Sequence, residues 1–106
     1  MLKKYQQTLA SSISFQGIGL HSGLKTKIKI KPGIEDQGIV FKRTDLKKNN
    51  LVIANYQNVS SARLCTTLKN KYGVKVSTVE HLLAALYIAD IDNALIEINA
   101  EEVPIL

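Results

Sequence analysis

Apolar and polar residues alternate along much of this chain, which is the pattern of β-strands that cover a core with one face. Residues 24–31 are the clearest case, because Ile28 and Ile30 alternate with lysines. Successive side chains of a strand point to opposite faces, so we expect the isoleucines in the core and the lysines on a polar face. Residues 94–98 repeat the alternation, with Glu97 on the outer side.

One segment has the longer period of a helix. Its apolar residues recur at the i, i+3, i+4 and i+7 spacing of a buried helical face. They are Val79, Leu82, Leu83 and Leu86. Ser77 and Glu80 have the S-x-x-E spacing of a capping box, in which each residue's side chain bonds a backbone N–H of the other. We therefore expect the helix to begin at Ser77 and to end at Asp90.

The same helix carries a second apolar strip. A helix turns by about 100° per residue, so His81 lies about 200° around the axis from Val79. Ala84, Ala85 and Ile88 lie near His81 on that side. Small apolar side chains suit close contact with another element, and this chain offers few segments that could cover them.

Short apolar runs bounded by Gly, Pro, Asn or Asp predict the remaining strands. They cover residues 9–15, 38–42, 51–54, 64–68 and 74–76. Strands outnumber helices, and most are joined by short turns. The expected fold class is therefore α+β, a mostly antiparallel β-sheet with a helix packed on one face, within one domain of 106 residues.

A glycine-rich segment, residues 17–23, separates the first two predicted strands. Gly17, Gly19 and Gly23 have the spacing G-x-G-x-x-x-G, which is neither the dinucleotide fingerprint nor a Walker A loop. No predicted helix follows directly whose N-terminus would hold a phosphate. We interpret the segment as a sheet corner that needs positive φ angles, and it places His21 where it can be exposed near a site.

The candidate chemistry lies at the start of the helix, where Glu80 and His81 are adjacent. A carboxylate and an imidazole in this arrangement suit a general base beside a metal ligand. The pair alone is a weak motif, and it is not H-E-x-x-H, because Ala85 and Ser77 stand four residues to either side of His81. Two plainer interpretations stay open: Glu80 as a capping residue and His81 as a surface imidazole.

The composition is that of an ordinary soluble globular domain, with 45% hydrophobic and 22% charged residues. The single Cys65 excludes an intrachain disulfide and is interpreted as a small buried apolar residue. The first residues form no apolar run typical of a signal peptide, and the longest apolar run, residues 82–89, is too short to span a bilayer. We therefore expect a cytoplasmic protein without a transmembrane segment.

The net charge is +5, and much of the basic character sits on the strand at residues 24–31. These lysines are Lys25, Lys27, Lys29 and Lys31. We interpret the stripe as a solvated sheet face, and the alternative is a patch for phosphates or nucleic acid. No aromatic residues alternate with the lysines, which weakens the case for single-stranded nucleic acid, so nucleic acid is not expected as a partner.

Five motifs follow one another along nearly the whole chain. They are Phe15-Gln16-Gly17-Ile18-Gly19-Leu20-His21-Ser22-Gly23, Leu64-Cys65-Thr66-Thr67-Leu68, Ser77-Thr78-Val79-Glu80-His81-Leu82-Leu83-Ala84-Ala85-Leu86, Ile91-Asp92-Asn93-Ala94-Leu95-Ile96-Glu97-Ile98 and Glu102-Val103-Pro104-Ile105. In this combination the chain closely resembles the UDP-3-O-acyl-N-acetylglucosamine deacetylases, the zinc amidohydrolases that make lipid A in Gram-negative bacteria.

The resemblance implies a protein of two related domains, each a sheet with two helices, with the helices of the two domains facing each other. Residues 1–106 resemble the N-terminal domain only. The family continues after the Glu-x-Pro-Ile segment with Asp-Gly-Ser and a second helix, whereas this sequence stops at Leu106. We therefore expect the second helix and the C-terminal domain to be missing from it.

The resemblance also implies roles for three residues. Glu80 matches the family's general base and His81 one of its zinc ligands, whereas His21 matches a histidine that lies near the active site without binding the metal. The other zinc ligands, a His and an Asp, and a His that acts as general acid belong to the second domain. The Zn²⁺ site is therefore expected to be incomplete in this chain.

The implied function of the full-length protein is zinc-dependent hydrolysis of the N-acetyl group of UDP-3-O-acyl-N-acetylglucosamine, a UDP-sugar lipid. The 106-residue chain by itself is predicted to be inactive. A second hypothesis is a non-catalytic interaction domain derived from this fold, and a third, a basic nucleic-acid-binding domain, rests on charge alone. The uncovered strip beside His81 predicts self-association of the isolated domain.

Overall fold

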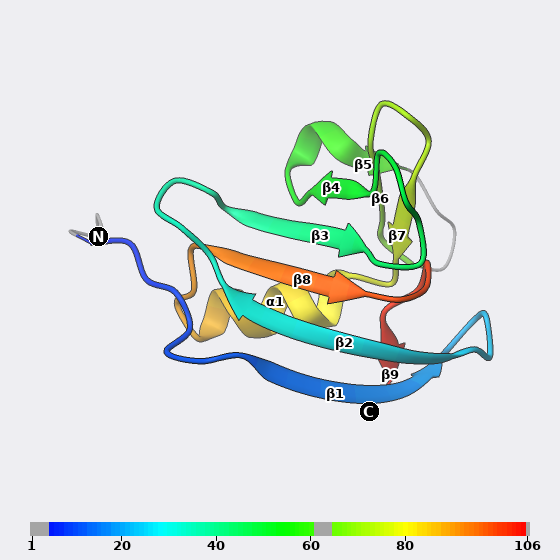
Figure 1. Cartoon of the computed structure of the whole chain (residues 1–106), viewed down its shortest axis with the longest axis horizontal. Helices are drawn as coiled ribbons and strands as arrows, with labels where there is room; N and C mark the ends of the chain where they lie inside the picture. Colours follow the sequence, from blue (N-terminus) through cyan, green and yellow to red (C-terminus); the bar gives the residue numbers. More distant parts are fainter. Residues whose placement is uncertain (1–4, 61–64, 106) are drawn as a thin grey trace.

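The computed structural model describes residues 5–60 and 65–105. Its main element is a six-stranded sheet in the order β4-β3-β8-β2-β1-β9 (Figure 1). The strands are β1 (Ile13–Gly19), β2 (Lys25–Pro32), β3 (Ile39–Arg43), β4 (Leu51–Ile53), β8 (Ala94–Ile98) and β9 (Pro104–Ile105). Neighbouring strands are antiparallel except β3 and β8, which are parallel.

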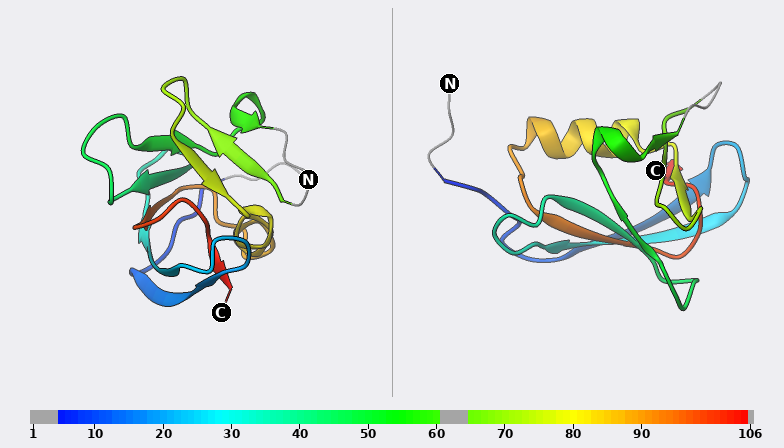
Figure 2. Two further views of the ribbon diagram at one scale, coloured as in Figure 1. Left: turned by 90° about the vertical axis from the view of Figure 1, so that its right-hand side faces the viewer. Right: turned by 90° about the horizontal axis from the view of Figure 1, so that it is seen from above.

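The α-helix of the described part of the chain, α1 (Glu80–Ile88), packs on one face of this sheet. Seen from above, helix and sheet form two layers (Figure 2). The expected α+β class, a mostly antiparallel sheet with a helix on one face, is confirmed. Across residues 5–60 and 65–105, no helix combines the length and the apolar character that a bilayer crossing requires.

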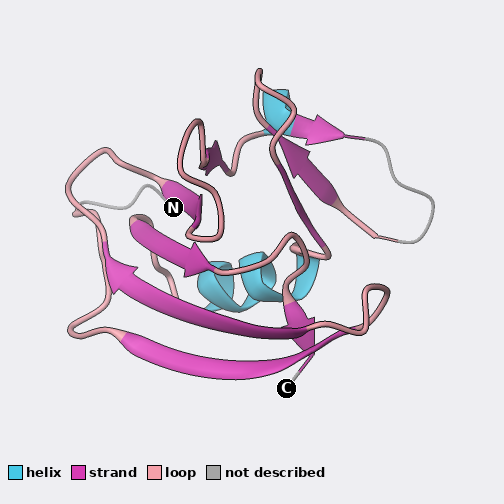
Figure 3. Cartoon of the chain, turned by 45° about the vertical axis from the view of Figure 1, so that its right-hand side comes forward, coloured by secondary structure: helices cyan, strands magenta, loops and turns pink. Residues whose placement is uncertain are grey.

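A second sheet of three short antiparallel strands stands beside the start of α1 (Figure 3). Its strands are β5 (Val59–Ser60), which follows the 3-10 helix η1 (Tyr56–Asn58), β6 (Thr67–Lys69) and β7 (Lys75–Ser77). Arg43 joins the two sheets, because its Nη1 donates to the Lys75 carbonyl at 2.9 Å. Asp45 binds the same buried guanidinium at 2.9 and 2.7 Å, a bidentate pair that fixes its orientation.

The side chains of β2 alternate between exposed and buried positions, as predicted. Ile28 and Ile30 are buried, while the first three lysines of the stripe are exposed and Lys31 pairs with Glu97 of β8 at 3.2 Å. The lysines thus lie on the face away from α1, as expected for a solvated sheet face. Among the residues that the structure describes, seven core side chains are completely buried: Phe41, Val52, Val76, Val79, Ala94, Ile96 and Ile98.

Five strands, β2, β3, β4, β7 and β8, lie within one residue of their predicted bounds at each end. The two-residue strands β5 and β9 were not predicted, because so short a strand has no measurable alternation. The strand expected at residues 64–68 begins at Thr67 among the described residues, and residue 64 lies outside them.

The prediction for β1 is wrong by four residues, since the strand runs from Ile13 to Gly19 and includes part of the expected turn. Gly17 and Gly19 allow other segments to pack closely against β1, and neither has a positive φ angle. A Cβ on Gly17 would collide with the backbone carbonyl of Ile105, so the bare glycine lets β9 pair alongside. Only Gly23 has the positive φ expected of the corner, at 70°.

The predicted helix start is also wrong. Ser77 is the last residue of β7, and its backbone N–H donates to the carbonyl of Glu101 at 2.8 Å, so the capping box does not form. Thr78 has a φ of 59°, a left-handed conformation that turns the chain, and α1 begins at Glu80 with no side-chain cap. An isolated parallel bridge between Ser77 and the distant residues 101–103 therefore prevails over the local capping signal.

Candidate functional site

The candidate pair stands on the first turn of α1. Glu80 is half-buried, and its two carboxylate oxygens each lie 3.3 Å from the backbone N–H of Thr66, which donates to them. His81 is exposed. The abrupt turn at Thr78 lets β7 lead directly into the helix, so both side chains are fixed to the rigid junction between a strand and a helix. A site carried by rigid elements keeps its side chains in place more accurately than one on loops.

The second candidate, His21, lies in the turn between β1 and β2. The turn is closed by two backbone hydrogen bonds, from Gly19 to Leu24 and from Gly23 to Gly19, both at 2.9 Å. His21 itself is exposed. The sequence placed His21 in an exposed turn, and the structure agrees.

One residue that sequence reasoning overlooked, Glu102, connects this turn to the helix start. Its carboxylate accepts hydrogen bonds from the backbone N–H groups of His21 and Ser22 and from the hydroxyl of Thr78. The side chain is 3% exposed. The sequence offered one signal, because Glu102 begins the last of the five motifs, but no role was assigned to it there.

The same contacts determine the charge state of Glu102. Burial raises the pKa of the carboxyl, but the hydrogen bonds from Thr78, Ser22 and His21 together outweigh burial and hold the pKa below its usual value. Hydrogen bonds donated to a carboxylate favour its ionised form. Glu102 is therefore an anion at neutral pH, with its charge directed at two segments of the candidate site.

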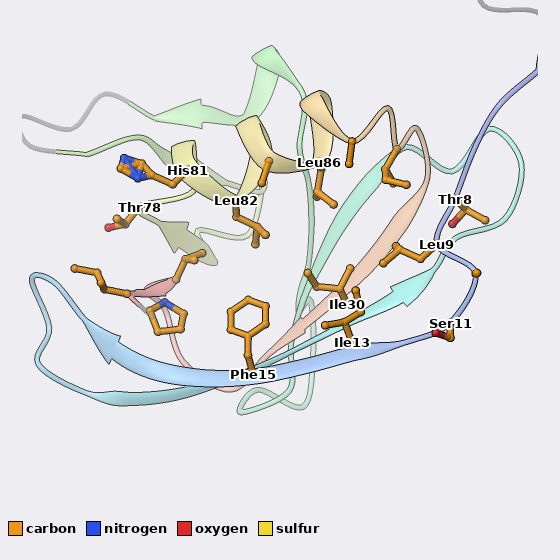
Figure 4. Close-up of a pocket in the computed structure, with 17 residues that line it drawn as sticks. Thr8, Leu9, Ser11, Ile13, Phe15, Ile30, Thr78, His81, Leu82 and Leu86 are labelled. Atoms are coloured by element: carbon orange, nitrogen blue, oxygen red, sulfur yellow. The ribbon is translucent and has the colours of Figure 1, made fainter.

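An apolar groove of about 830 Å³ runs between α1 and the strands β1 and β9. His81 and Thr78 lie at one end of the groove, and Leu9 and Ser11 lie at the other (Figure 4). Between them the walls are apolar and include Phe15, Ile30, Ile13, Leu82 and Leu86. The candidate residue His81 thus stands at one end of this apolar groove.

The second helical strip is as uncovered as the sequence predicted. His81, Ala84 and Ala85 are exposed, and Ile88 is 82% exposed. Cys65 differs from its prediction, because it is half-buried rather than buried, with its Sγ 3.8 Å from the Thr67 hydroxyl.

Residues 6–106 match the profile of the family described as LpxC: UDP-3-O-acyl N-acetylglycosamine deacetylase. The chain belongs to this family. Relatives named UDP-3-O-acyl-N-acetylglucosamine deacetylase include one from Geotalea uraniireducens (strain Rf4), 47% identical over 102 residues, which are 96% of this chain and 33% of the relative. Those from Haemophilus influenzae (strain PittEE) and Pasteurella multocida (strain Pm70) are each 46% identical over 101 residues, 95% of this chain and 33% of the relative. The chain spans about a third of the length of the curated relatives it matches.

No three His, Cys, Asp or Glu side chains gather within residues 5–60 and 65–105 in a way that could hold a metal ion. Glu80 and His81 are adjacent in the sequence. The Glu102 carboxylate, which contacts the His21 turn, already accepts hydrogen bonds from His21, Ser22 and Thr78. A metal ion bound at His81 would therefore need further ligands from outside the described residues.

Proposed function

We propose that this chain is the N-terminal domain, residues 1–106, of a zinc-dependent deacetylase. The full-length protein would hydrolyse the N-acetyl group of UDP-3-O-acyl-N-acetylglucosamine in lipid A biosynthesis, in the cytoplasm of a Gram-negative bacterium. Family membership over residues 6–106 and the names of the relatives support this reaction. The observation that carries the proposal for this chain is the adjacent pair Glu80 and His81 at the rigid start of α1, beside the mouth of the groove.

His81 is the residue of this chain that would hold the zinc ion. Its imidazole is exposed at the end of the groove, so a ring nitrogen is free to face a ligand set supplied by a second domain. When bound, zinc supplies a Lewis acid that polarises the acetamide carbonyl and acidifies water. His81 would be one of the three protein ligands that catalytic zinc usually takes, because the described residues offer no group of three.

Glu80 is proposed as the general base. Its carboxylate would accept a proton from the water that attacks the acetamide carbonyl, and the tetrahedral intermediate would then collapse to acetate and the free amine. The 3.3 Å hydrogen bonds from Thr66 are long, so they hold the carboxylate in place without engaging it strongly. Proton delivery to the leaving amine falls to a histidine of the second domain, and His21 is proposed to lie near the active site without binding the metal.

Two substitutions in the full-length protein test these roles. Glu80→Gln should remove most of the acetate release but leave the zinc content unchanged, because the base is lost and the ligands are not. His81→Ala should lower zinc content as well as activity. The measurements are acetate release from the UDP-sugar lipid and metal content by elemental analysis, with Glu101→Gln as an exposed control carboxylate. Equal loss of zinc in both variants would contradict this division of roles.

Residues 1–106 alone are proposed to be inactive, because the second helix of this domain and the C-terminal domain would complete the site. A second candidate function is a non-catalytic interaction domain derived from the same fold. The uncovered groove favours it, together with Tyr87 at 85% and Ile88 at 82% exposure. A downstream Asp-Gly-Ser and an H-x-x-x-D motif in the encoded protein would favour the enzyme, whereas their absence would favour the interaction domain.

A further inference from the structure

A single buried carboxylate touches both segments of the proposed site. The Oε1 atom of Glu102 accepts from the backbone N–H groups of His21 at 3.0 Å and Ser22 at 2.8 Å. The Oε2 atom accepts from the same N–H of His21 at 3.1 Å and from the hydroxyl of Thr78 at 2.7 Å. Two successive backbone N–H groups that converge on one anion form a nest, the usual backbone device for binding negative charge.

The backbone of the same segment is tied to the strand that leads into α1. Ser77 donates its N–H to the carbonyl of Glu101 at 2.8 Å and accepts the N–H of Val103 at 3.0 Å, which makes a parallel bridge around Glu102. Thr78 follows with its left-handed φ of 59°. The two neighbours of Glu102 therefore bind the backbone of Ser77, and the Glu102 side chain binds Thr78. Ser77 and Thr78 link β7 to α1, which carries Glu80 and His81.

The turn packs closely against the carboxylate. A Cβ on Gly19 would collide with the Glu102 carboxylate and the Ser22 hydroxyl, so the turn lies directly on the charged group. A non-glycine conformation with positive φ, such as that of Thr78, costs free energy and persists only where its surroundings enforce it. The hydrogen bond from the Thr78 hydroxyl to Glu102 is one such enforcing contact.

We propose that Glu102 is a positioning residue of the deacetylase site: it fixes the His21 turn against the start of α1 and so sets the placement of Glu80 and His81. The part of this inference that concerns catalysis rests on the proposed function. A carboxylate suits the position because it only accepts hydrogen bonds, whereas the amide of Gln would turn an N–H₂ group toward a donor. Glu102→Gln therefore preserves the shape and breaks the network.

The first test compares steady-state kinetics of full-length variants. Glu102→Gln should lower kcat by about tenfold or more, because small misplacements of catalytic groups cost that much, while KM and zinc content change little. Thr78→Val removes one donor and should lower kcat less, whereas Thr78→Ser keeps the hydroxyl and should restore it. In the Glu102→Gln background, Thr78→Val should have little further effect, because both changes break the same contact.

Glu101→Gln, one residue away and exposed, is the matched control and should behave as wild type. A folded Glu102→Gln enzyme with wild-type kcat would overturn the proposal. If Glu102→Gln fails to fold, the Thr78 pair decides: equal kcat in Thr78→Val and Thr78→Ser would overturn it as well.

A second measurement separates this inference from the proposed function. Amide proton chemical shifts of the full-length protein report the network whether or not the protein is an enzyme. Thr78→Val should move the amide signals of His21 and Ser22, across the carboxylate, together with those of Glu80 and His81. If wild type releases no acetate, the proposed function fails while this readout still tests the network. Unmoved His21 and Ser22 signals would overturn the network itself.

Discussion

The closed core and the open groove are built from the same kinds of side chain but differ in what covers them. Phe41 on β3 is completely buried and lies between Val52 and Ile96 of the neighbouring strands. Phe15 on β1 is only partly buried and lines the groove beside α1. Both positions fit the alternation of a strand. An apolar pattern therefore identifies the inner face of an element but not whether another element covers that face.

The largest expected effect is on stability, and it separates the two phenylalanines. Phe41→Ala should lower the free energy of unfolding by about 3–5 kcal/mol, because it leaves a cavity in a fully enclosed site. Phe15→Ala should cost less than half as much, since solvent already reaches the groove. Urea unfolding of the 106-residue chain, followed by circular dichroism, measures both. Equal losses would mean that the groove is as closed as the core.

The next largest effect is on the oligomeric state of the isolated chain, in which the groove is uncovered. We expect the isolated chain to self-associate, because a contiguous apolar surface of this kind favours a partner and a second copy is the one always available. Ala85 is exposed on the groove side of α1, so Ala85→Glu should weaken the association at least tenfold, by about 1.4 kcal/mol.

Light scattering across a concentration series measures this association. Lys27→Glu, on the polar face of β2, is the control and should leave it unchanged. A monomer at high micromolar concentration, unaffected by the change at Ala85, would contradict the prediction.

The third and smallest effect is on the stability of the fold at low pH. The folded state lowers the pKa of Glu102 below its ordinary value of 4.5, so its contribution to stability is present above that value and is lost as pH falls through the folded pKa. Asp45 acts in the same sense, because the hydrogen bonds from Arg43 lower the pKa of its carboxyl despite partial burial. The difference in unfolding free energy between wild type and Glu102→Gln should therefore shrink below pH 4.5.

Amide hydrogen exchange locates this loss of stability. Acid should loosen the His21 turn before it affects β8 in the closed core, because Glu102 contacts the turn. Glu101→Gln should keep the pH dependence of wild type. Simultaneous loosening of the turn and of β8 would show that the carboxylate has no local role.

Much of the sheet followed from the sequence, whereas β1 did not. The strands β2, β3, β4, β7 and β8 lie within one residue of their predicted bounds at each end, because each carries a clear alternation flanked by turn residues. For β1, the glycines at positions 17 and 19 indicated a turn. Their actual use, close approach of β9 at Gly17 and of the Glu102 carboxylate at Gly19, depends on a segment some 85 residues later.

The candidate site, too, followed from the sequence in part and depended on the tertiary structure for the rest. The sequence by itself determined that Glu80 and His81 are adjacent, that the apolar face of the helix is distinct from the strip beside His81, and that His21 lies in a turn. Only the tertiary structure decided where the helix begins, because Ser77 bonds Glu101 rather than capping α1. It alone also assigned Glu102 its place between the two segments. The physical reason is that local signals compete with hydrogen-bond partners distant in sequence. Two backbone hydrogen bonds of Ser77, to Glu101 and Val103, take the place of a single capping contact.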